Sequence, residues 1–262
     1  MTPGPVALVT GAAGGMGGAI VAGLVEDGFH VIGVDACVPM PGAASRPGRE
    51  HALRDLESSA PGQVDTAIID VRHRAAVGRL IESIDSAHRR LDVVVAAAGA
   101  VAGGHPMWEA PEGELDVMLD VNLRGVWNLA AAAVPLMLRA EPPRSGRFIA
   151  VASAAVHRGL QQLTAYGASK HAVVGLVRGL AADLRGSGIT ATVVSPGSTR
   201  TEMLGATAAL YGLDTIEPLA ERHLVERVLE PDEIADAVRW LSSPRSSAVT
   251  GSVVHVDGGF TT

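Results

Sequence analysis

Residues 6–17, VALVTGAAGGMG, join a short apolar run to a helical pattern through a glycine-rich loop. Val6–Thr10 has the length and composition of a buried strand, and Gly15–Asp27 has a helical pattern that Gly28 closes. Glycines at such a junction let the backbone approach a pyrophosphate, which the free N–H groups and dipole of the helix N-terminus stabilise. The segment therefore predicts a strand–loop–helix unit that binds a nucleotide.

Short apolar runs alternate with longer helical patterns along the rest of the chain. The expected strands are Val6–Thr10, His30–Asp35, Val64–Asp70, Leu91–Ala97, Arg147–Ser153, Ile189–Ser195 and Ser252–Val256. The expected helices are Gly15–Asp27, His73–Arg89, Glu114–Arg139, Thr164–Arg185 and Asp232–Leu241. This alternation predicts the α/β class, with residues 1–262 forming a single domain. We expect a doubly wound, Rossmann-type parallel sheet of about seven strands with helices on both faces.

Two long segments interrupt this alternation. Residues 36–62 follow the second strand, and their first half is rich in Pro, Gly, Ala and Ser. Residues 199–230 lie between the sixth strand and the last helix. Long loops in compact domains are usually functional. We expect 36–62 to be an insertion and 199–230 to be a substrate lid.

Composition excludes several classes of protein. The net charge of −7 does not provide the basic face that a nucleic-acid partner requires. No apolar run reaches the length of a membrane span, and the N-terminus has no basic leader region. Cys37 is the only cysteine, so no internal disulfide can form. These features predict a cytoplasmic protein without a membrane partner, and no metal ligands are predicted.

Asp35 ends the second expected strand, where a carboxylate can accept hydrogen bonds from both hydroxyls of an adenosine ribose. The same carboxylate would repel a 2′-phosphate, and neither Gly14 nor Ala36 supplies a cation to bind one. We therefore expect NAD as the cofactor and not NADP. The alternative is that Asp35 is an ordinary turn residue at a strand end.

Lys170 is the only lysine, and every other basic residue among the 21 Lys and Arg positions is arginine. It follows Tyr166 by four positions, so the phenol and the ammonium would share one helix face. Taken alone, such a pair is most often part of a solvated surface. A compact ammonium beside a phenol would, however, stabilise the phenolate and lower the pKa of the tyrosine.

These motifs together resemble the short-chain dehydrogenase/reductase family over nearly the whole chain. Thr10, Gly11, Gly15 and Gly17 match its Thr-Gly-x-x-x-Gly-x-Gly pattern. Its Ser…Tyr-x-x-x-Lys pattern and an associated asparagine imply a catalytic set of Asn122, Ser153, Tyr166 and Lys170. Tyr166 would be the general acid or base, and Ser153 would hold the substrate oxygen. Lys170 would bind the nicotinamide ribose and lead through Asn122 to a water path.

The resemblance also implies a set of cofactor contacts. They are Thr10, Gly11, Gly15, Met16, Gly17, Asp35, Asp70, Val71, Gly99, Tyr166, Lys170, Pro196, Gly197, Thr199 and Thr201. Ala96 and Ala97 replace the two asparagines of the family's Asn-Asn-Ala-Gly segment, so the hydrogen bonds of those side chains are missing. The C-terminal segment 251–259 resembles one that supports tetramer packing, which implies a homotetramer.

Loops after the fourth and fifth strands, together with 199–230, supply the candidate substrate residues, because open α/β sheets bind ligands at the carboxyl ends of their strands. The candidates are His105, Trp108, Ala155, His157, Met203, Leu204 and Tyr211. This mainly apolar set predicts a secondary alcohol or ketone with a hydrophobic body. For each histidine, a structural role is an equal alternative.

A narrower resemblance concerns the mycofactocin-associated branch of the family. It rests on the insertion that starts at Asp35–Pro39, on Val121–Asn128 and on Ser195–Met203. The resemblance implies that NAD is held without exchange and that mycofactocin accepts the electrons. The alternatives are a simple surface elaboration, an ordinary NAD-exchanging alcohol dehydrogenase and a non-catalytic NAD-binding regulator.

Overall fold

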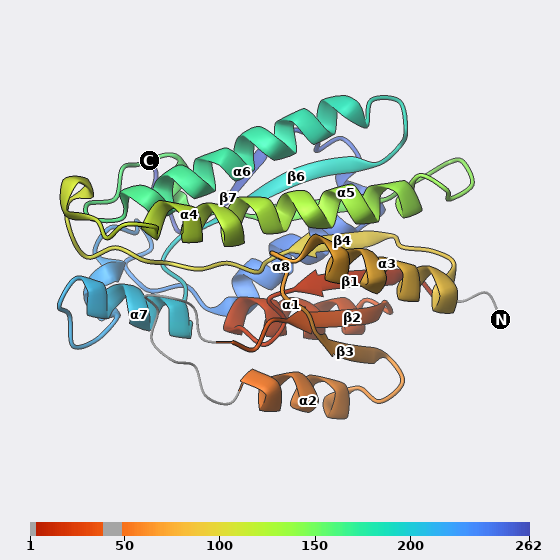
Figure 1. Ribbon diagram of the computed structural model, residues 1–262, viewed down its shortest axis with the longest axis horizontal. Coiled ribbons are helices and arrows are strands. Elements are labelled where there is room, and N and C mark those ends of the chain that lie inside the picture. The colour runs from red at the N-terminus through yellow and green to blue at the C-terminus, as the bar shows by residue number, and fades with distance from the viewer. Residues whose placement is uncertain (1–3, 39–48) are drawn as a thin grey trace.

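The computed structural model describes residues 4–38 and 49–262, and seven of their strands form one parallel sheet (Figure 1). The strands are β1 (Val6–Thr10), β2 (His30–Asp35), β3 (Val64–Ile68), β4 (Val93–Ala96), β5 (Arg147–Val151), β6 (Thr190–Pro196) and β7 (Val253–Val256). Their order is β3-β2-β1-β4-β5-β6-β7, and each neighbouring pair is parallel. The predicted fold class is confirmed. The order reverses between β1 and β4, where folds of this type bind ligands.

Helices cover both faces of the sheet (Figure 1). They are α1 (Gly15–Glu26), α2 (Arg49–Ser59), α3 (Arg74–His88), α4 (Glu114–Leu119), α5 (Gly125–Met137), α6 (Thr164–Asp183), α7 (Glu202–Leu210) and α8 (Pro231–Ser242). On β1, Val6 and Leu8 pack toward α3, α5 and α6, while Ala7 and Val9 pack toward α1, α2 and α8. Successive side chains of a strand point to opposite faces. A strand that is buried on both faces therefore has the continuous apolar run seen in the sequence.

The structure corrects several predicted boundaries. The long helix expected over Glu114–Arg139 is interrupted by a π-helical turn at Asp120–Arg124. Both long segments contain a helix that was not predicted: α2 lies within 36–62, and α7 lies within 199–230. Residues 39–48 of the expected insertion lie outside the described residues. Strands β3 and β5 end two residues earlier than predicted, so Asp70 and Ser153 lie in loops.

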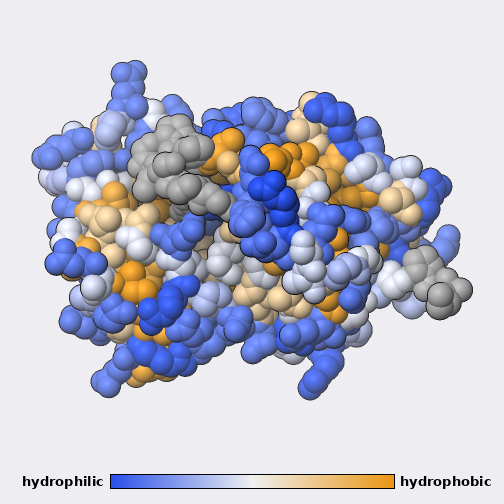
Figure 2. Space-filling model, turned by 90° about the horizontal axis from the view of Figure 1, so that it is seen from below, coloured by the Kyte–Doolittle hydropathy of each residue, from blue (hydrophilic) through white to orange (hydrophobic). Residues whose placement is uncertain are grey.

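Figure 2 views the molecule from the side of α2, where a mostly hydrophilic surface carries separate apolar patches. None of the helices in the described ranges combines the length and the apolar character needed to cross a membrane.

Helix α5 lies very close to the loop that follows β3. A Cβ added at Gly125 would stand 2.6 Å from Val71 Cγ2. One turn further along the helix, Asn128 Nδ2 donates to the carbonyl oxygens of Val71 and Arg72 at 2.9 and 3.1 Å. Glycine and asparagine together fix the position of this loop on the helix.

The Gly125→Ala variant should therefore lower the free energy of unfolding by about 1–3 kcal/mol, because the new methyl group forces the helix away from Val71. Urea denaturation would measure the change. Gly78→Ala is the matched control, since Gly78 lies in α3 with nothing within 4 Å of an added Cβ. That control should be neutral or stabilising by up to about 1 kcal/mol. Equal effects of the two substitutions would contradict the close approach described here.

Candidate active site

The glycine-rich loop adopts the conformation that its sequence predicts. Gly11 has a φ of +71°, and a Cβ there would lie 2.8 Å from the backbone of Ala98. A Cβ at Gly17 would lie 2.1 Å from the carbonyl oxygen of Gly11. Gly14 caps α1 and, without a side chain, provides no capping hydrogen bond to the free N–H groups at this helix end. The loop thus keeps an open anion-binding helix terminus at the carboxyl end of β1.

Thr10 anchors the loop after β4, where Ala96 and Ala97 replace the family's asparagines. Its Oγ1 accepts hydrogen bonds from the backbone N–H groups of Ala97 and Ala98 at 3.2 and 3.1 Å. Only 2% of Thr10 is exposed. The threonine therefore lies behind the loop and positions it.

Two adjoining clefts run along the carboxyl ends of the strands. The first is lined by nine of the predicted cofactor residues: Gly11, Gly15, Met16, Gly17, Asp35, Asp70, Val71, Gly99 and Thr201. The second is lined by Ser153 and Tyr166, and also by Pro196, Gly197 and Thr199. Met16, Thr201 and Met203 line both clefts. The glycine cradle, the open helix end and the carboxylate of Asp35 fit an NAD molecule that extends through both.

Asp35 has a cationic partner that the sequence analysis missed. Arg49 Nη2 donates to Oδ2 at 2.6 Å, and Arg49 Nε donates to Oδ1 at 3.1 Å. The backbone N–H of Cys37 also donates to Oδ1, at 2.9 Å. Gly14 and Ala36 supply no cation beside Asp35, but Arg49 does, and it lines the same cleft. Fourteen residues separate it from Asp35, and only the position of α2 brings the two together.

Asp70 and Val71 form the far wall of the first cleft. Arg72 binds Asp70 through both its side chain and its backbone N–H, with distances of 2.6–3.0 Å. Burial raises the pKa of Asp70, but the hydrogen bonds from Arg72 outweigh it and hold the pKa below its ordinary value. Asp70 therefore stays ionised and fixed where contact with the adenine was predicted.

Two of the four predicted catalytic residues, Ser153 and Tyr166, line the second cleft, whereas Asn122 and Lys170 are buried beside Gly99. Ser153 follows β5, and its side chain forms a hydrogen bond with Tyr166. Lys170 Nζ lies 5.9 Å from the centroid of the Tyr166 ring and donates to the carbonyl oxygen of Val151 at 3.0 Å. A Cβ added at Gly99 would be 3.3 Å from both Lys170 Nζ and Asn122 Oδ1. The structure thus brings together residues separated by up to 48 positions.

Asn122 lies in the π-helical turn, a feature that often marks functional positions. Its Oδ1 accepts from the N–H of Ala100 at 2.8 Å, while Nδ2 donates to the carbonyl oxygen of Ala100 and to Ser169 Oγ. Ser169 in turn donates to the carbonyl oxygen of Tyr166 at 2.7 Å. Asn122 therefore ties the loop after β4 to the helix that carries Tyr166 and Lys170.

The electrostatics of the pair differ from the sequence prediction. Burial raises the pKa of Tyr166, against a smaller lowering by the hydrogen bond with Ser153. Burial also lowers the pKa of Lys170 to about 8. The predicted lowering of the tyrosine pKa is not seen in this structure, because removal of the phenol from water has the larger effect.

The segment after β6 is held by His223, which the sequence analysis also missed. His223 Nε2 accepts from the N–H of Ser198 at 3.0 Å, and Nδ1 lies 2.6 Å from the carbonyl oxygen of Arg227. This pattern assigns a neutral ring that is protonated on Nδ1. The ring supports Pro196 and Gly197 where they line the second cleft. No local sequence signal distinguishes it from the other histidines.

The predicted substrate residues divide into two groups. Met203 and Leu204 line the second cleft, as predicted. Three of the other candidates have partners of their own. His105 Nε2 lies 3.0 Å from Glu114 Oε2, and the His157 ring centroid lies 4.1 Å from that of His255. The Tyr211 hydroxyl donates to the carbonyl oxygen of Gln161. In the described part of the chain, the residues that line this cleft do not include Ala155, His105, His157, Trp108 or Tyr211.

Apolar residues that were not predicted line the second cleft instead: Val101, Ala152, Ala154, Leu160, Leu163 and Phe260. Leu160 and Leu163 come directly before the helix that carries Tyr166, and this position could have identified them as cleft residues. No sequence signal could have identified Phe260, which lies near the C-terminus.

Comparisons with known proteins agree with this geometry. The family model described as Enoyl-(Acyl carrier protein) reductase matches residues 11–261. An uncharacterized NAD-dependent oxidoreductase of Mycobacterium tuberculosis is 31% identical over 268 residues, which cover 98% of this chain and 95% of that protein. The (-)-trans-carveol dehydrogenase of Rhodococcus erythropolis is 30% identical over 272 residues and covers 98% of each chain.

Among solved structures, the carveol dehydrogenase of Mycobacterium avium in complex with NAD is similar with a TM-score of 0.90. It is 28% identical, and the match covers 98% of each chain. The extent of these matches and the arrangement of Asn122, Ser153, Tyr166 and Lys170 lead to one conclusion. The chain belongs to the short-chain dehydrogenase/reductase family.

Proposed function

We propose that this protein interconverts a secondary alcohol and its ketone with NAD as the redox partner. The main support for this proposal is that Ser153, Tyr166 and Lys170 lie close together where the cofactor cleft joins an apolar cleft. The NAD-dependent dehydrogenases among its relatives support NAD and chemistry at a CH–OH group. When bound, NAD supplies the acceptor or donor of the hydride.

Tyr166 moves the proton in this proposal. Its buried phenol has a raised pKa and is therefore protonated at neutral pH, ready to donate to a ketone oxygen. Ser153 donates a hydrogen bond to the same oxygen and orients it. In the oxidation direction Tyr166 must first lose its proton. A protonated Lys170, whose Nζ lies 5.9 Å from the centroid of the Tyr166 ring, would then favour the phenolate.

The second cleft defines the class of substrate. Away from Ser153 and Tyr166 its walls are mostly aliphatic or aromatic, including Leu160, Leu163 and Phe260. Met203 and Leu204 come from the first turn of α7, so we propose that 199–230 acts as the lid over the substrate. A secondary alcohol or ketone with a hydrophobic body fits such a lining.

We further propose that NAD is retained between turnovers and that mycofactocin reoxidises it. Arg49 supports this proposal from the side of the cofactor. An ionised carboxylate has about four acceptor positions, of which Arg49 and the Cys37 N–H occupy three on Asp35, so one position remains for a ribose hydroxyl. Arg49 would then hold the segment after β2, with the proposed insertion 36–62, against the adenosine. An ordinary dehydrogenase that exchanges NAD is the competing function.

A homotetramer remains part of the proposal. Trp127 on α5 is 59% exposed, and Trp240 on α8 is 42% exposed. A second copy of the chain would cover such side chains. The cytoplasmic location stays a prediction.

The Tyr166→Phe variant should bind NAD with little change in affinity, because its ring stays buried, yet lose at least about 100-fold in kcat. Steady-state assays with a panel of secondary alcohols and ketones, with NAD titrated by calorimetry, would measure both quantities. Tyr211→Phe is the control at the only other tyrosine and should keep kcat within about threefold. Activity of Tyr166→Phe near that of the wild type would refute the proposed acid–base role.

The Lys170→Met variant should unfold less readily than the wild type at pH 7 when NAD is absent. Burial lowers the Lys170 pKa from 10.5 to about 8, so below pH 8 the folded protein bears an electrostatic cost of up to about 3 kcal/mol. Between pH 8 and 10.5 the unfolded chain holds a proton that the folded protein has lost, which makes wild-type stability rise. The advantage of the variant should therefore shrink over that window. Urea denaturation at several pH values tests this, and a constant difference would contradict it.

Freshly purified protein should release near-stoichiometric nicotinamide nucleotide after heat denaturation. Arg49→Gln should release several-fold less after gel filtration, since it leaves the buried Asp35 carboxylate without its ion pair. Arg54→Gln, an exposed position on the same helix, is the control and should match the wild type. Wild-type protein without bound nucleotide, or equal retention in all three proteins, would refute retention through Arg49.

A further inference from the structure

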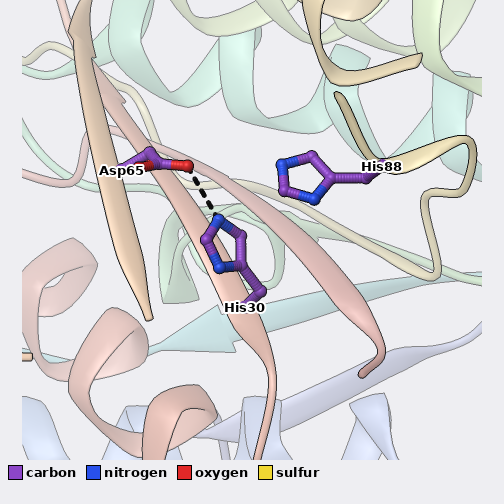
Figure 3. A group of neighbouring side chains, drawn as sticks. All are labelled: His30, Asp65 and His88. Atoms are coloured by element: carbon purple, nitrogen blue, oxygen red, sulfur yellow. Dashed lines mark hydrogen bonds and ion pairs between the residues drawn. The ribbon is translucent and has the colours of Figure 1, made fainter. Parts of the chain in front are cut away.

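Three metal-ligating side chains meet at the end of the sheet opposite to the active site (Figure 3). His30 is the first residue of β2, Asp65 is the second residue of β3, and His88 is the last residue of α3. The parallel pairing of β2 with β3 places Ile32 beside Asp65, so His30 and Asp65 share the amino ends of these strands. The catalytic groups lie at the carboxyl ends, and the cluster is therefore separate from the proposed redox site.

The geometry of the cluster is close to that of a bound ion. His30 Nε2 lies 2.8 Å from Asp65 Oδ2, and the rings of His30 and His88 are 4.6 Å apart between centroids. One ligand atom from each of the three residues lies within 4.8 Å of the other two. Figure 3 shows a nitrogen of His88 facing the gap between Asp65 and His30. Ligands on a tetrahedral zinc ion, with bonds of about 2.0–2.1 Å, are about 3.4 Å apart.

Small side-chain rotations would close the remaining distance. The Asp65 side chain is 61% exposed and can turn without disturbing the core. His88 is half-buried at the helix end, next to Arg89 in the left-handed conformation.

The chemistry of the three groups favours a first-row transition ion. Two imidazole nitrogens and one carboxylate suit zinc and its neighbours better than magnesium or calcium, which prefer oxygen ligands alone. His30 and Asp65 already bind each other, whereas His88 contacts the His30 ring but has no hydrogen-bond partner among the described residues.

We propose that His30, Asp65 and His88 bind one divalent transition-metal ion, with Zn²⁺ as the preferred occupant and water at the open position. The ion would tie α3 to β2 and β3. Residues so far apart in the sequence have no metal-binding spacing, which is why no metal ligand was predicted. None of the three residues lines the cleft that holds Ser153 and Tyr166.

Calorimetric titration of the full chain, freed of any affinity tag and treated with EDTA, tests the proposal with Zn²⁺. The wild type should bind one ion per chain and gain thermal stability on binding. Co²⁺ should give the visible absorption of a low-coordinate site. His88→Gln and Asp65→Asn should each weaken Zn²⁺ binding at least about tenfold, because even outer partners of metal ligands contribute that much.

His255→Gln is the matched control. His255 also stacks on a histidine, at 4.1 Å, and its Nδ1 lies 3.6 Å from Asp257. Binding should persist in this variant. Circular dichroism of the metal-free variants separates loss of a ligand from misfolding, and the exposed Asp65→Asn change is the one least able to disturb the fold. No Zn²⁺ binding by the wild type, or binding lost in His255→Gln and kept in His88→Gln, would overturn the proposal.

Discussion

A parallel sheet that helices cover on both faces can place polar chemistry only at the ends of its strands. On β1 every side chain before Thr10 is apolar and buried, because successive residues face alternate helical layers. Thr10, Asp35 and Ser153 stand where strands end or have just ended. This constraint gathers the glycine loop, the ribose carboxylate and the catalytic hydroxyls along one edge. It likewise leaves His30 and Asp65 at the opposite edge.

Much of the fold could be predicted because its signals are local. Apolar runs marked all seven strands to within about two residues at each end, and glycines marked the ends of helices. The π turn escaped notice because one extra residue per turn hardly alters the hydrophobic pattern. Helix α2 follows a segment whose composition resembles a loop, and mean hydropathy does not separate a short surface helix such as this from polar loop sequence.

In the site, too, residues close in sequence could be predicted together, whereas partners that are distant in sequence could not. Spacing along one helix identified Tyr166 and Lys170, and the structure places them together. Arg49 could not be found, since nothing near it in sequence requires a partner for Asp35. Histidines chosen because they follow strands turned out to have other neighbours, Glu114 for His105 and His255 for His157. The direction of the Tyr166 pKa depended on burial, which a sequence pattern does not measure.

The hydroxyl of Thr10 has a consequence for how such chains are recognised. In this protein a single buried threonine holds two backbone amides of the next strand's loop, so that loop keeps its place with alanines at positions 96 and 97. The asparagine side chains of the family pattern are then not needed to hold this loop, whereas Thr10 bonds it directly and Gly11 approaches the backbone of Ala98 closely. A search pattern that demands asparagine there would discard proteins of this kind, whereas one built on the threonine and the close-packed glycine would retain them.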